Sequence, residues 1–285
     1  MKRFHCIMLI AGAIVTCLMF PNITRAEQFK IAIMQDQQGV AAKYKPLLVY
    51  LAKKGVEASF VATKDYPAAA QLFAAGQADA MFSGSGIAGT MIIKGLAEPE
   101  VRPVGNDGHS TYWAVVIAPK GVPSFTGSAD LFKGKRVIMT GLASAGEFYF
   151  HSIPGYKESG AQILKAASHG AAIDALDKGQ ADFAIVKNRV WDENKYKYPN
   201  LVKIGEDKGE NPDDTMIVSK KADKGSVSKV VSALLGLKED TSAEATAAKN
   251  SLAITGYIKT TTKDFGHTIS LLRAAGVTKE FAFRY

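Results

Sequence analysis

Two nine-residue stretches that lie about a hundred residues apart resemble each other, and this repeat restricts the fold more than any other feature of the sequence. Residues 72–80 read LFAAGQADA and residues 175–183 read ALDKGQADF. In each, a helical pattern meets a glycine that can end the helix, and an aspartate then leads into an apolar strand. Each copy also follows a strand, a turn and a helix. The repeat therefore predicts two similar α/β lobes, with a chance match of the letters GQAD as the alternative.

The segment around the first copy alternates strands and helices with short connections, which is typical of α/β folds. We expect each lobe to hold a central mixed sheet flanked by helices. The residue pattern predicts the following order: strand 29–34, helix 44–53, strand 57–62, helix 68–75, strand 78–82 and an apolar helix that ends near Lys94.

Two isolated apolar strands flank the second lobe. Residues 112–118 form the first, which ends at Pro119, and residues 215–219 form the second. We interpret both as hinge crossings, through which the chain enters lobe 2 and returns to complete lobe 1 with helices at 227–235 and 271–275. Two independent consecutive domains are the alternative, although no linker rich in Pro, Ser and Gly separates them. The predicted division is a signal peptide at 1–26, lobe 1 at 27–112, lobe 2 at 113–214 and the return to lobe 1 at 215–285.

The N-terminus has the pattern of a secretory signal peptide. Two basic residues precede an apolar stretch at 7–20, and a small-x-small cleavage pattern ends at Ala26. The apolar stretch of 14 residues is too short to span a membrane. Cleavage after Ala26 would leave a mature, exported chain of 259 residues. A lipidated Cys17 is the alternative, although the Thr16 before it is bulkier than the residue usual at that place.

Removal of residues 1–26 would also set the composition of the mature protein. Both cysteines, Cys6 and Cys17, lie in this segment, so the mature chain would carry no disulfide and no thiolate metal site. Subtracting the three basic residues of the segment from the formal net charge of +8 leaves +5. A mild positive excess favours anionic ligands through long-range attraction. No basic run with interleaved aromatic residues is present, which argues against nucleic-acid binding.

Residues 134–154 combine a short apolar strand, a turn of small residues and the start of an aromatic helix. Such a unit directs free backbone N–H groups from the positive end of the helix dipole toward an anion. An ordinary turn that binds nothing is the alternative. The predicted anion contacts are Ser144, Ala145 and Gly146 in this turn, and Ser83 and Ser85 in the matching turn of lobe 1.

The chain lacks the short motifs that mark common enzyme classes. It contains no G-x-S-x-G and no H-E-x-x-H, and the predicted mature chain has no cysteine nucleophile. The sequence therefore predicts no catalysis, no cofactor and no metal site. The histidines of the mature chain are scattered: His109, His151, His169 and His267.

Several short motifs together resemble one known family in their order and spacing. They are Asp65-Tyr66, GQAD with the Ser83 turn, Tyr112-Trp113, Asp130-Leu131 before Gly134-Lys135-Arg136-Val137, Ala143-Ser144-Ala145-Gly146, Ser168-His169 and Pro212-Asp213-Asp214. Over nearly the whole mature chain, the sequence resembles type II periplasmic solute-binding proteins of ABC transporters, and most closely their phosphonate- and phosphite-binding branch. The resemblance implies two α/β lobes joined by a two-strand hinge, with the ligand between the lobes.

The resemblance also implies a set of ligand contacts. In that family two tyrosines, a hydroxyl-rich helix start, a histidine and acidic residues surround the phosphonate. The matching positions are Tyr66, Tyr112, Ser144, His169 and Asp214. Two departures matter: Ala143 and Ala145 replace two of the three hydroxyl residues in the family's Ser-Thr-Ser-Gly, and Arg189 stands where aminophosphonate binders hold the ligand's amine with a glutamate. Because Arg cannot accept a hydrogen bond from an ammonium group, Arg189 would favour a second anionic group or lie outside the site. A small oxyanion remains the expected ligand.

By this resemblance the protein would be a monomeric periplasmic component that binds a phosphonate-, phosphite- or phosphate-like oxyanion and presents it to an ABC permease. A ligand-sensing partner of a membrane receptor would have the same fold and pocket. A metal-carrying variant would need paired tyrosines, such as Tyr149 and Tyr156, together with carboxylates. An enzyme is the least favoured alternative.

Overall fold

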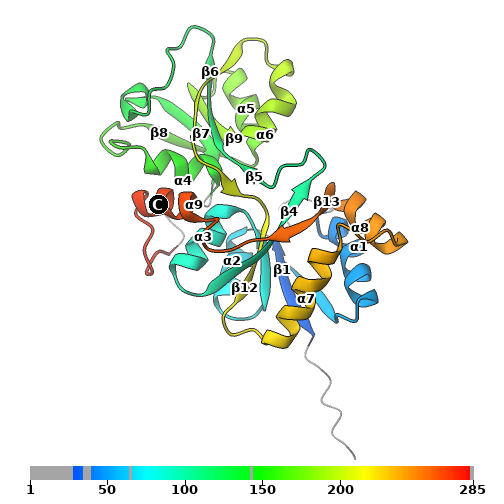
Figure 1. The fold of residues 1–285 in the computed structure, drawn as a ribbon. Helices are drawn as coiled ribbons and strands as arrows, with labels where there is room; N and C mark the ends of the chain where they lie inside the picture. The colour runs from blue at the N-terminus through cyan, green and yellow to red at the C-terminus, as the bar shows by residue number, and fades with distance from the viewer. Residues whose placement is uncertain (1–27, 35–39, 64–65, 142–143, 283–285) are drawn as a thin grey trace, which may run out of the picture.

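The computed structural model describes residues 28–34, 40–63, 66–141 and 144–282, so the predicted signal peptide lies outside the described part of the chain. No helix in these ranges is long and apolar enough to cross a membrane. Two lobes are visible, each built on its own sheet, and a pair of short strands joins them (Figure 1). The predicted α/β class and the mixed sheet in each lobe are confirmed.

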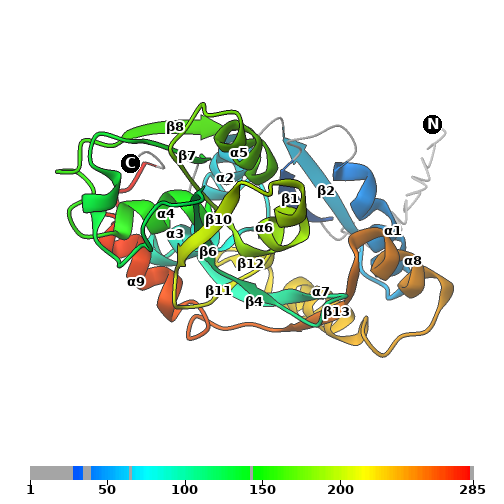
Figure 2. The same cartoon turned by 90° about the horizontal axis from the view of Figure 1, so that it is seen from above.

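Lobe 1 is built on a six-stranded sheet with the order β13-β4-β12-β3-β1-β2. β1, β2 and β3 are parallel, whereas β12 runs antiparallel to both β3 and β4. Its strands are β1 (Phe29–Met34), β2 (Ala58–Thr63), β3 (Ala80–Ser83), β4 (Ala97–Gly105), β12 (Thr215–Ser219) and β13 (Ile254–Lys259). Its helices are α1 (Val40–Lys53), α2 (Tyr66–Ala74), α3 (Ser85–Ile93), α7 (Lys224–Gly236), α8 (Ala243–Leu252) and α9 (Gly266–Ala274). Seen from above, α1 and α8 lie side by side at one end of the molecule (Figure 2).

Lobe 2 repeats this arrangement with a five-stranded sheet in the order β10-β6-β9-β7-β8. Here β7, β8 and β9 are parallel, and β6 runs antiparallel to β9 and β10. The order matches β4-β12-β3-β1-β2 of lobe 1 strand for strand, so the lobes share one topology. The elements are β6 (Ala114–Pro119), β7 (Arg136–Thr140), β8 (Gln162–Ala166), β9 (Phe183–Lys187), β10 (Leu201–Glu206), α4 (Ala145–Ser152), α5 (His169–Asp177), α6 (Asn188–Asn194) and the 3₁₀ turns Ala129–Phe132 and Lys195–Lys197.

The sequence repeat has the same structural role in both lobes. Gly76 and Gly179 follow α2 and α5 with φ of +74° and +70°, the left-handed conformation that glycine adopts at the end of a helix. The aspartate of each copy then binds the backbone of the first of the three parallel strands in its lobe, β1 or β7. A carboxylate oxygen of Asp79 accepts from the Lys30 N–H at 2.8 Å, and one of Asp182 accepts from the Arg136 N–H at 2.8 Å. The two GQAD sequences therefore have the same structural role in both lobes, and their similarity is not a chance match.

The chain crosses between the lobes twice, through β5 (Thr111–Tyr112) and β11 (Asn211–Pro212), which pair with each other. The predicted continuous strand at 112–118 is wrong, because β5 ends at Tyr112 and β6 begins at Ala114 in a different sheet. Trp113 interrupts them: its backbone exchanges hydrogen bonds of 3.0 and 3.1 Å with Asn188 at the start of α6. The predicted hinge crossing at 215–219 is also wrong, because these residues form β12 inside the sheet of lobe 1. The predicted division of the chain at 112 and 214 stays a prediction, since the hinge pair belongs to neither large sheet.

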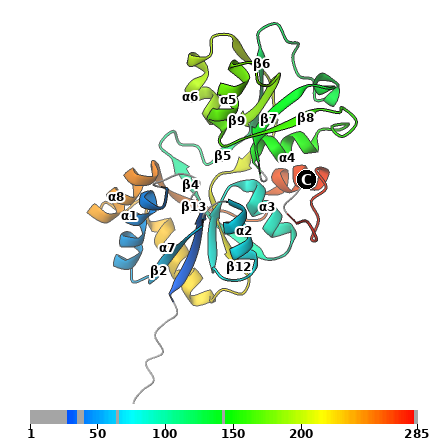
Figure 3. The same ribbon diagram turned by 180° about the vertical axis from the view of Figure 1, so that it is seen from behind.

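The C-terminal helix α9 contacts both lobes. It packs on α3 of lobe 1 and on α4 of lobe 2, as the front and rear views show (Figures 1 and 3). Phe148 of α4 and Leu272 of α9 are fully buried in one small apolar cluster. α9 also binds the hinge, because Thr268 Oγ1 donates to Asn211 Oδ1 of β11 at 2.7 Å. The sequence assigned this helix to lobe 1 alone, whereas the structure makes it a third connection between the lobes.

Candidate anion-binding site

Six helices of the described residues begin at the carboxyl ends of parallel strands, where open α/β sheets usually bind their ligands. α1 and α2 follow β1 and β2 in lobe 1. α3 follows β3 in lobe 1, and α4, α5 and α6 follow β7, β8 and β9 in lobe 2. The backbone N–H groups in the first turn of a helix attract anions. The predicted residues in these first turns are Tyr66 in α2, Ser85 in α3, Ala145 and Gly146 in α4, His169 in α5 and Arg189 in α6.

The start of α4 is held tightly against β9. Ser144 is the N-cap: its hydroxyl accepts from the Glu147 N–H at 3.2 Å and donates to the Thr140 carbonyl. Ala145 and Gly146 are buried, and no side chain fits at Gly146, because an added Cβ would overlap the Ile185 carbonyl group. In this structure α4 therefore offers backbone N–H groups to an anion, while the Ser144 proton is directed to Thr140.

The turn in lobe 1 contains a buried hydroxyl group without a partner. Ser83 ends β3 with an exposed fraction of 2%, and its Oγ makes no hydrogen bond within the described part of the chain. Gly84 then caps α3 without any side-chain hydrogen bond. A buried hydroxyl that loses its bonds to water without replacing them costs free energy, so it usually indicates a missing partner. An anion at the start of α3 would supply one.

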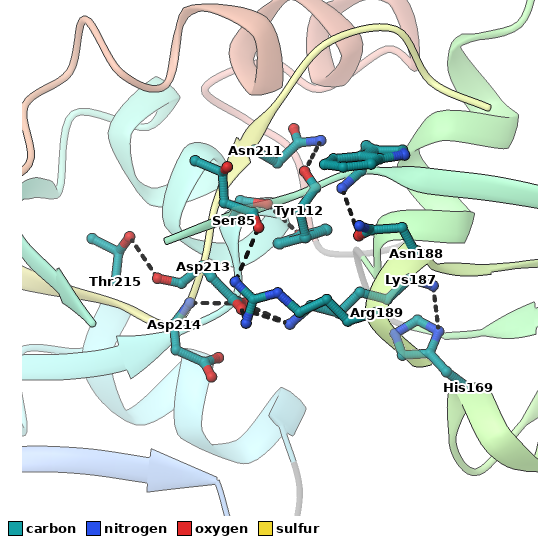
Figure 4. A network of polar contacts seen from close by, with 12 residues as sticks. Ser85, Tyr112, His169, Lys187, Asn188, Arg189, Asn211, Asp213, Asp214 and Thr215 are labelled. Carbon is teal, nitrogen blue, oxygen red and sulfur yellow. Dashed lines mark hydrogen bonds and ion pairs between the residues drawn. The ribbon is translucent and has the colours of Figure 1, made fainter. Parts of the chain in front are cut away.

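A chain of contacts connects this turn to lobe 2 (Figure 4). The Ser85 and Tyr112 hydroxyl groups share a short hydrogen bond. The Nζ of Lys187, the last residue of β9, lies 4.7 Å from the centre of the Tyr112 ring, within the range of a cation–π contact. Burial raises the pKa of Tyr112 well above its usual range, so its hydroxyl stays protonated and can donate. The hinge tyrosine thus links a helix start of lobe 1 to a cation of lobe 2.

A group of ion pairs lies beside Tyr112. Lys187 Nζ binds both carboxylate oxygens of Asp213, at 2.7 and 2.8 Å, and Arg189 Nη1 lies 3.1 Å from Asp213 Oδ2. Arg189 Nη2 also donates to the Thr111 carbonyl at 3.0 Å. Both cations come from lobe 2, whereas Asp213 lies next to β11 of the hinge. Arg189, whose role the sequence left open, is thus directed to acceptors in the hinge (Figure 4).

His169 is neutral at neutral pH. Burial is the main cause that lowers its pKa to about 4, and Lys187 lowers it further while Asp213 acts in the opposite direction. The Lys187 backbone N–H donates to His169 Nδ1 at 3.4 Å, a long hydrogen bond that assigns the ring proton to Nε2. A neutral imidazole with a proton on Nε2 can donate to an oxyanion.

Asp214 differs from its neighbour Asp213 in having no cation close to its carboxylate among the ion pairs of the described residues. Its pKa is raised to about 6, first by the adjacent negative charge of Asp213 and second by desolvation, while Lys187 and Arg189 lower it. Its φ of +32° lies in the left-handed region, which costs free energy for a residue other than glycine. At neutral pH Asp214 is therefore ionised against its electrostatic surroundings and also has an unfavourable backbone conformation.

We expect the Asp214→Asn variant to become more stable relative to the parent protein as pH rises. A raised carboxyl pKa favours the protonated folded state, so the stabilisation is complete below the ordinary pKa of 3.8 and is lost as pH rises through about 6. Asn cannot ionise and also tolerates the left-handed region. Because part of the Asp214 residue remains in contact with solvent, which screens its charge, we expect a difference of about 1 kcal/mol between pH 4 and pH 7. Urea unfolding at the two pH values measures it, and an equal difference at both would contradict the assignment.

The contacts described above link nearly all of the predicted site residues to one another. Thr140 links two of them, since it accepts from Ser144 and its hydroxyl lies 3.4 Å from His169 Nδ1. Ser83 is the strand partner of Thr215, the residue after Asp214. Tyr66 begins α2, but its side chain lies outside what the structure describes. Sequence reasoning missed Lys187 and the role of Asp213, although the repeat contained a signal: Lys187 ends the strand after the second GQAD, as Ser83 ends the strand after the first.

The metal-carrying alternative finds no support in the tyrosines that it required. Tyr149 is buried in the apolar core of lobe 2, and Tyr156 packs against that core, 4.8 Å from the ring of His151. Within the described ranges, no group of three or more His, Asp, Glu or Cys side chains is arranged to hold a metal ion.

The sequence matches a family model described as "ABC transporter, phosphonate, periplasmic substrate-binding protein" over residues 29–265. The chain belongs to this family. No curated protein sequence matches the chain. Members of this family are periplasmic substrate-binding proteins of transporters, and it is not an enzyme family. The match over residues 29–265 includes the hinge and the site residues described above.

Solved structures of phosphonate-type and related binding proteins share this fold at low sequence identity. A Xanthomonas citri protein bound to chloride ion is 14% identical with a TM-score of 0.71, over 87% of this chain and 97% of that one. PhnD1 from Prochlorococcus marinus, in complex with methylphosphonate, is 17% identical with a TM-score of 0.65, over 87% and 98%. A binding protein component of an ABC phosphonate transporter from Pseudomonas aeruginosa is 15% identical with a TM-score of 0.64, over 87% and 86%.

Proposed function

We propose that this protein binds a small oxyanion of the phosphonate, phosphite or phosphate type between its lobes and delivers it to an ABC permease. The observation that carries the proposal is the buried hydroxyl of Ser83, which has no hydrogen-bond partner among the described residues and lies directly before the start of α3. Family membership and the complex of PhnD1 with methylphosphonate support the ligand class. Action as a monomer and removal of residues 1–26 belong to the same proposal.

The proposed site would hold the oxyanion by neutral donors from both lobes. Lobe 1 would contribute Ser83 and the N–H groups at the start of α3, and lobe 2 would contribute the N–H groups of α4 and the Nε2 proton of His169. Donors that are already oriented lose little freedom when the anion binds. Contacts made to both lobes at once would favour the closed arrangement over the open one, because a ligand shifts an equilibrium only through its unequal affinity for the two states.

We expect a matching oxyanion to raise the melting temperature of the protein. A ligand at a hundredfold excess over its Kd stabilises the folded state by about 2.7 kcal/mol, which is about 5–10 °C for a chain of this size. The panel is phosphate, phosphite, sulfate, methylphosphonate, a sulfonate and a carboxylate. Ser83→Ala should weaken binding about tenfold while leaving the ligand-free protein as stable or slightly more stable, since it removes an unsatisfied hydroxyl.

Ser159→Ala is the matched control for this experiment. Ser159 is also buried, but its hydroxyl has partners: it donates to the Tyr156 carbonyl at 2.6 Å and accepts from the Ala161 N–H at 3.3 Å. This control should lose stability, by about 1 kcal/mol, and keep its affinity. The proposal fails if no anion of the panel shifts the melting temperature of the parent protein.

A further inference from the structure

We propose that Lys187 is a ligand-binding cation of this protein, and that Asp213 is the internal counter-ion that holds it until an anion arrives. This inference rests on the proposed function and adds a specificity-determining pair to it. In the ligand-free protein, the Asp213 carboxylate forms an ion pair with the Lys187 ammonium group. On binding, the oxyanion takes the place of Asp213 beside the ammonium group, so one ion pair is exchanged for another.

The two partners differ in their access to solvent. The Lys187 side chain is 21% exposed, whereas the Asp213 side chain is 6% exposed. An incoming anion can therefore reach the ammonium group while the carboxylate remains covered. Lys187 is also part of the site through its backbone, because its N–H donates to His169 Nδ1. The same residue thus fixes the tautomer of a proposed ligand contact and places a positive charge near it.

Asp213 keeps other partners when Lys187 leaves. Arg189 Nη1 lies 3.1 Å from its Oδ2, and the Asp214 N–H donates to its Oδ1 at 3.1 Å. Arg189 is held in place by the Thr111 carbonyl. Leaving a buried charge without any partner is strongly unfavourable, and here the exchange avoids it. This second cation explains why a buried carboxylate can release one of its ion pairs to a ligand.

Tyr112 gives the released ammonium group a favourable surface. Lys187 Nζ already lies 4.7 Å from the ring centre, and the hydroxyl of the same ring is bound to Ser85 at the start of α3. An anion at the first turn of α3 would therefore lie next to the ring that Lys187 contacts. A cation that moves over an aromatic face keeps its attraction to that face. The ammonium group would therefore keep a favourable contact with the Tyr112 ring as it moves from Asp213 to the anion.

The experiment measures methylphosphonate and phosphate binding by isothermal titration calorimetry at low salt, where charge effects are largest. Lys187→Met should weaken binding about 10- to 100-fold, because a charge-assisted hydrogen bond is lost. Asp213→Asn should strengthen binding about tenfold, because the internal competitor is gone. The control is Lys203→Met, which removes an exposed lysine of the same lobe paired with Glu206 at 2.8 Å and should change affinity less than about twofold.

Each outcome decides the proposal. Unchanged affinity in Lys187→Met, with binding intact in the parent protein, overturns the inference and leaves the proposed function standing. Weaker binding in a folded Asp213→Asn variant also overturns it, since Asp213 would then be a ligand contact. If Asp213→Asn does not fold by circular dichroism, Lys187→Met decides alone. If the parent protein binds neither anion, the titrations are made with the panel anion that raises its melting temperature; if no anion of the panel does so, the proposed function and this inference both fall.

Discussion

Gly146→Ala is expected to lower the free energy of unfolding by about 3 kcal/mol and the melting temperature by about 6–12 °C. A Cβ at this position would lie 2.9 Å from the Ile185 carbonyl carbon, closer still to the oxygen, and 3.2 Å from Met139 Cβ. These are atoms of β9 and β7 in the core of lobe 2, so the start of α4 must move away from the sheet. Anion affinity should fall as well, because α4 would no longer present its N–H groups in the same place.

Gly170→Ala is the matched control for this prediction. Gly170 is the second residue of α5, as Gly146 is the second residue of α4. A Cβ at Gly170 would meet nothing closer than Ser168 Oγ at 3.9 Å. Alanine is a better helix former than glycine, so the control should be neutral or stabilised by up to about 1 kcal/mol. Thermal and urea unfolding of the two variants compare them directly, and similar losses in both would contradict the close-packing explanation.

Phe148→Ala is expected to destabilise the protein by about 3–5 kcal/mol and to loosen the arrangement of the lobes. Phe148 belongs to lobe 2, but it packs in a cluster with Leu272 of α9 and Val277, and all three are buried. Truncation leaves a cavity at this contact between the lobes. Because the predicted mature chain has no cysteine, spin labels can be placed by Val49→Cys in lobe 1 and Tyr196→Cys in lobe 2, which are 58% and 85% exposed. The distance distribution between the labels should broaden.

The control for this prediction is Phe150→Ala, two residues further along α4. Phe150 is equally buried but packs inside lobe 2, with its ring centre 5.4 Å from that of Phe132. It should lose a similar amount of stability, as judged by urea unfolding, without broadening the distances between the lobes. If both variants broaden the distribution equally, α9 does not connect the lobes in the way we describe.

Local patterns predicted the elements whose residues alternate or cluster by type. The strands expected at 29–34 and 215–219 coincide with β1 and β12, and the helix expected to end near Lys94 is α3, with Lys94 as its C-cap. β4 was missed, because Pro99 and Pro103 and several charged residues interrupt its apolar pattern. Pairing with β12 on one side and β13 on the other forms this strand despite those residues, so tertiary contacts override a weak local preference.

The candidate site was predictable only where a family motif or the repeat marked a residue. Helix starts follow from local sequence, which is why Ser85, Ser144 and His169 lie where they were expected. The partners of a side chain are different, since Lys187 and Asp213 are 26 residues apart, one at the end of β9 and the other just after β11. Nothing in either local sequence determines that their side chains meet across the hinge. The same holds for Arg189, which forms ion pairs with Asp107 and Asp213 and donates a hydrogen bond to the Thr111 carbonyl.

The exchange of strands between the two halves of the chain has a consequence for biosynthesis. β12 lies between β3 and β4, so a nascent chain that stops before residue 215 cannot join the two parts of the first sheet. Contacts between segments so far apart in sequence form slowly, because a long loop must close first. A periplasmic protein has to traverse the inner membrane before it adopts its final shape. This topology keeps the first sheet incomplete until residues 215–219 have been synthesised, and a chain that folds late would suit passage through a translocation channel.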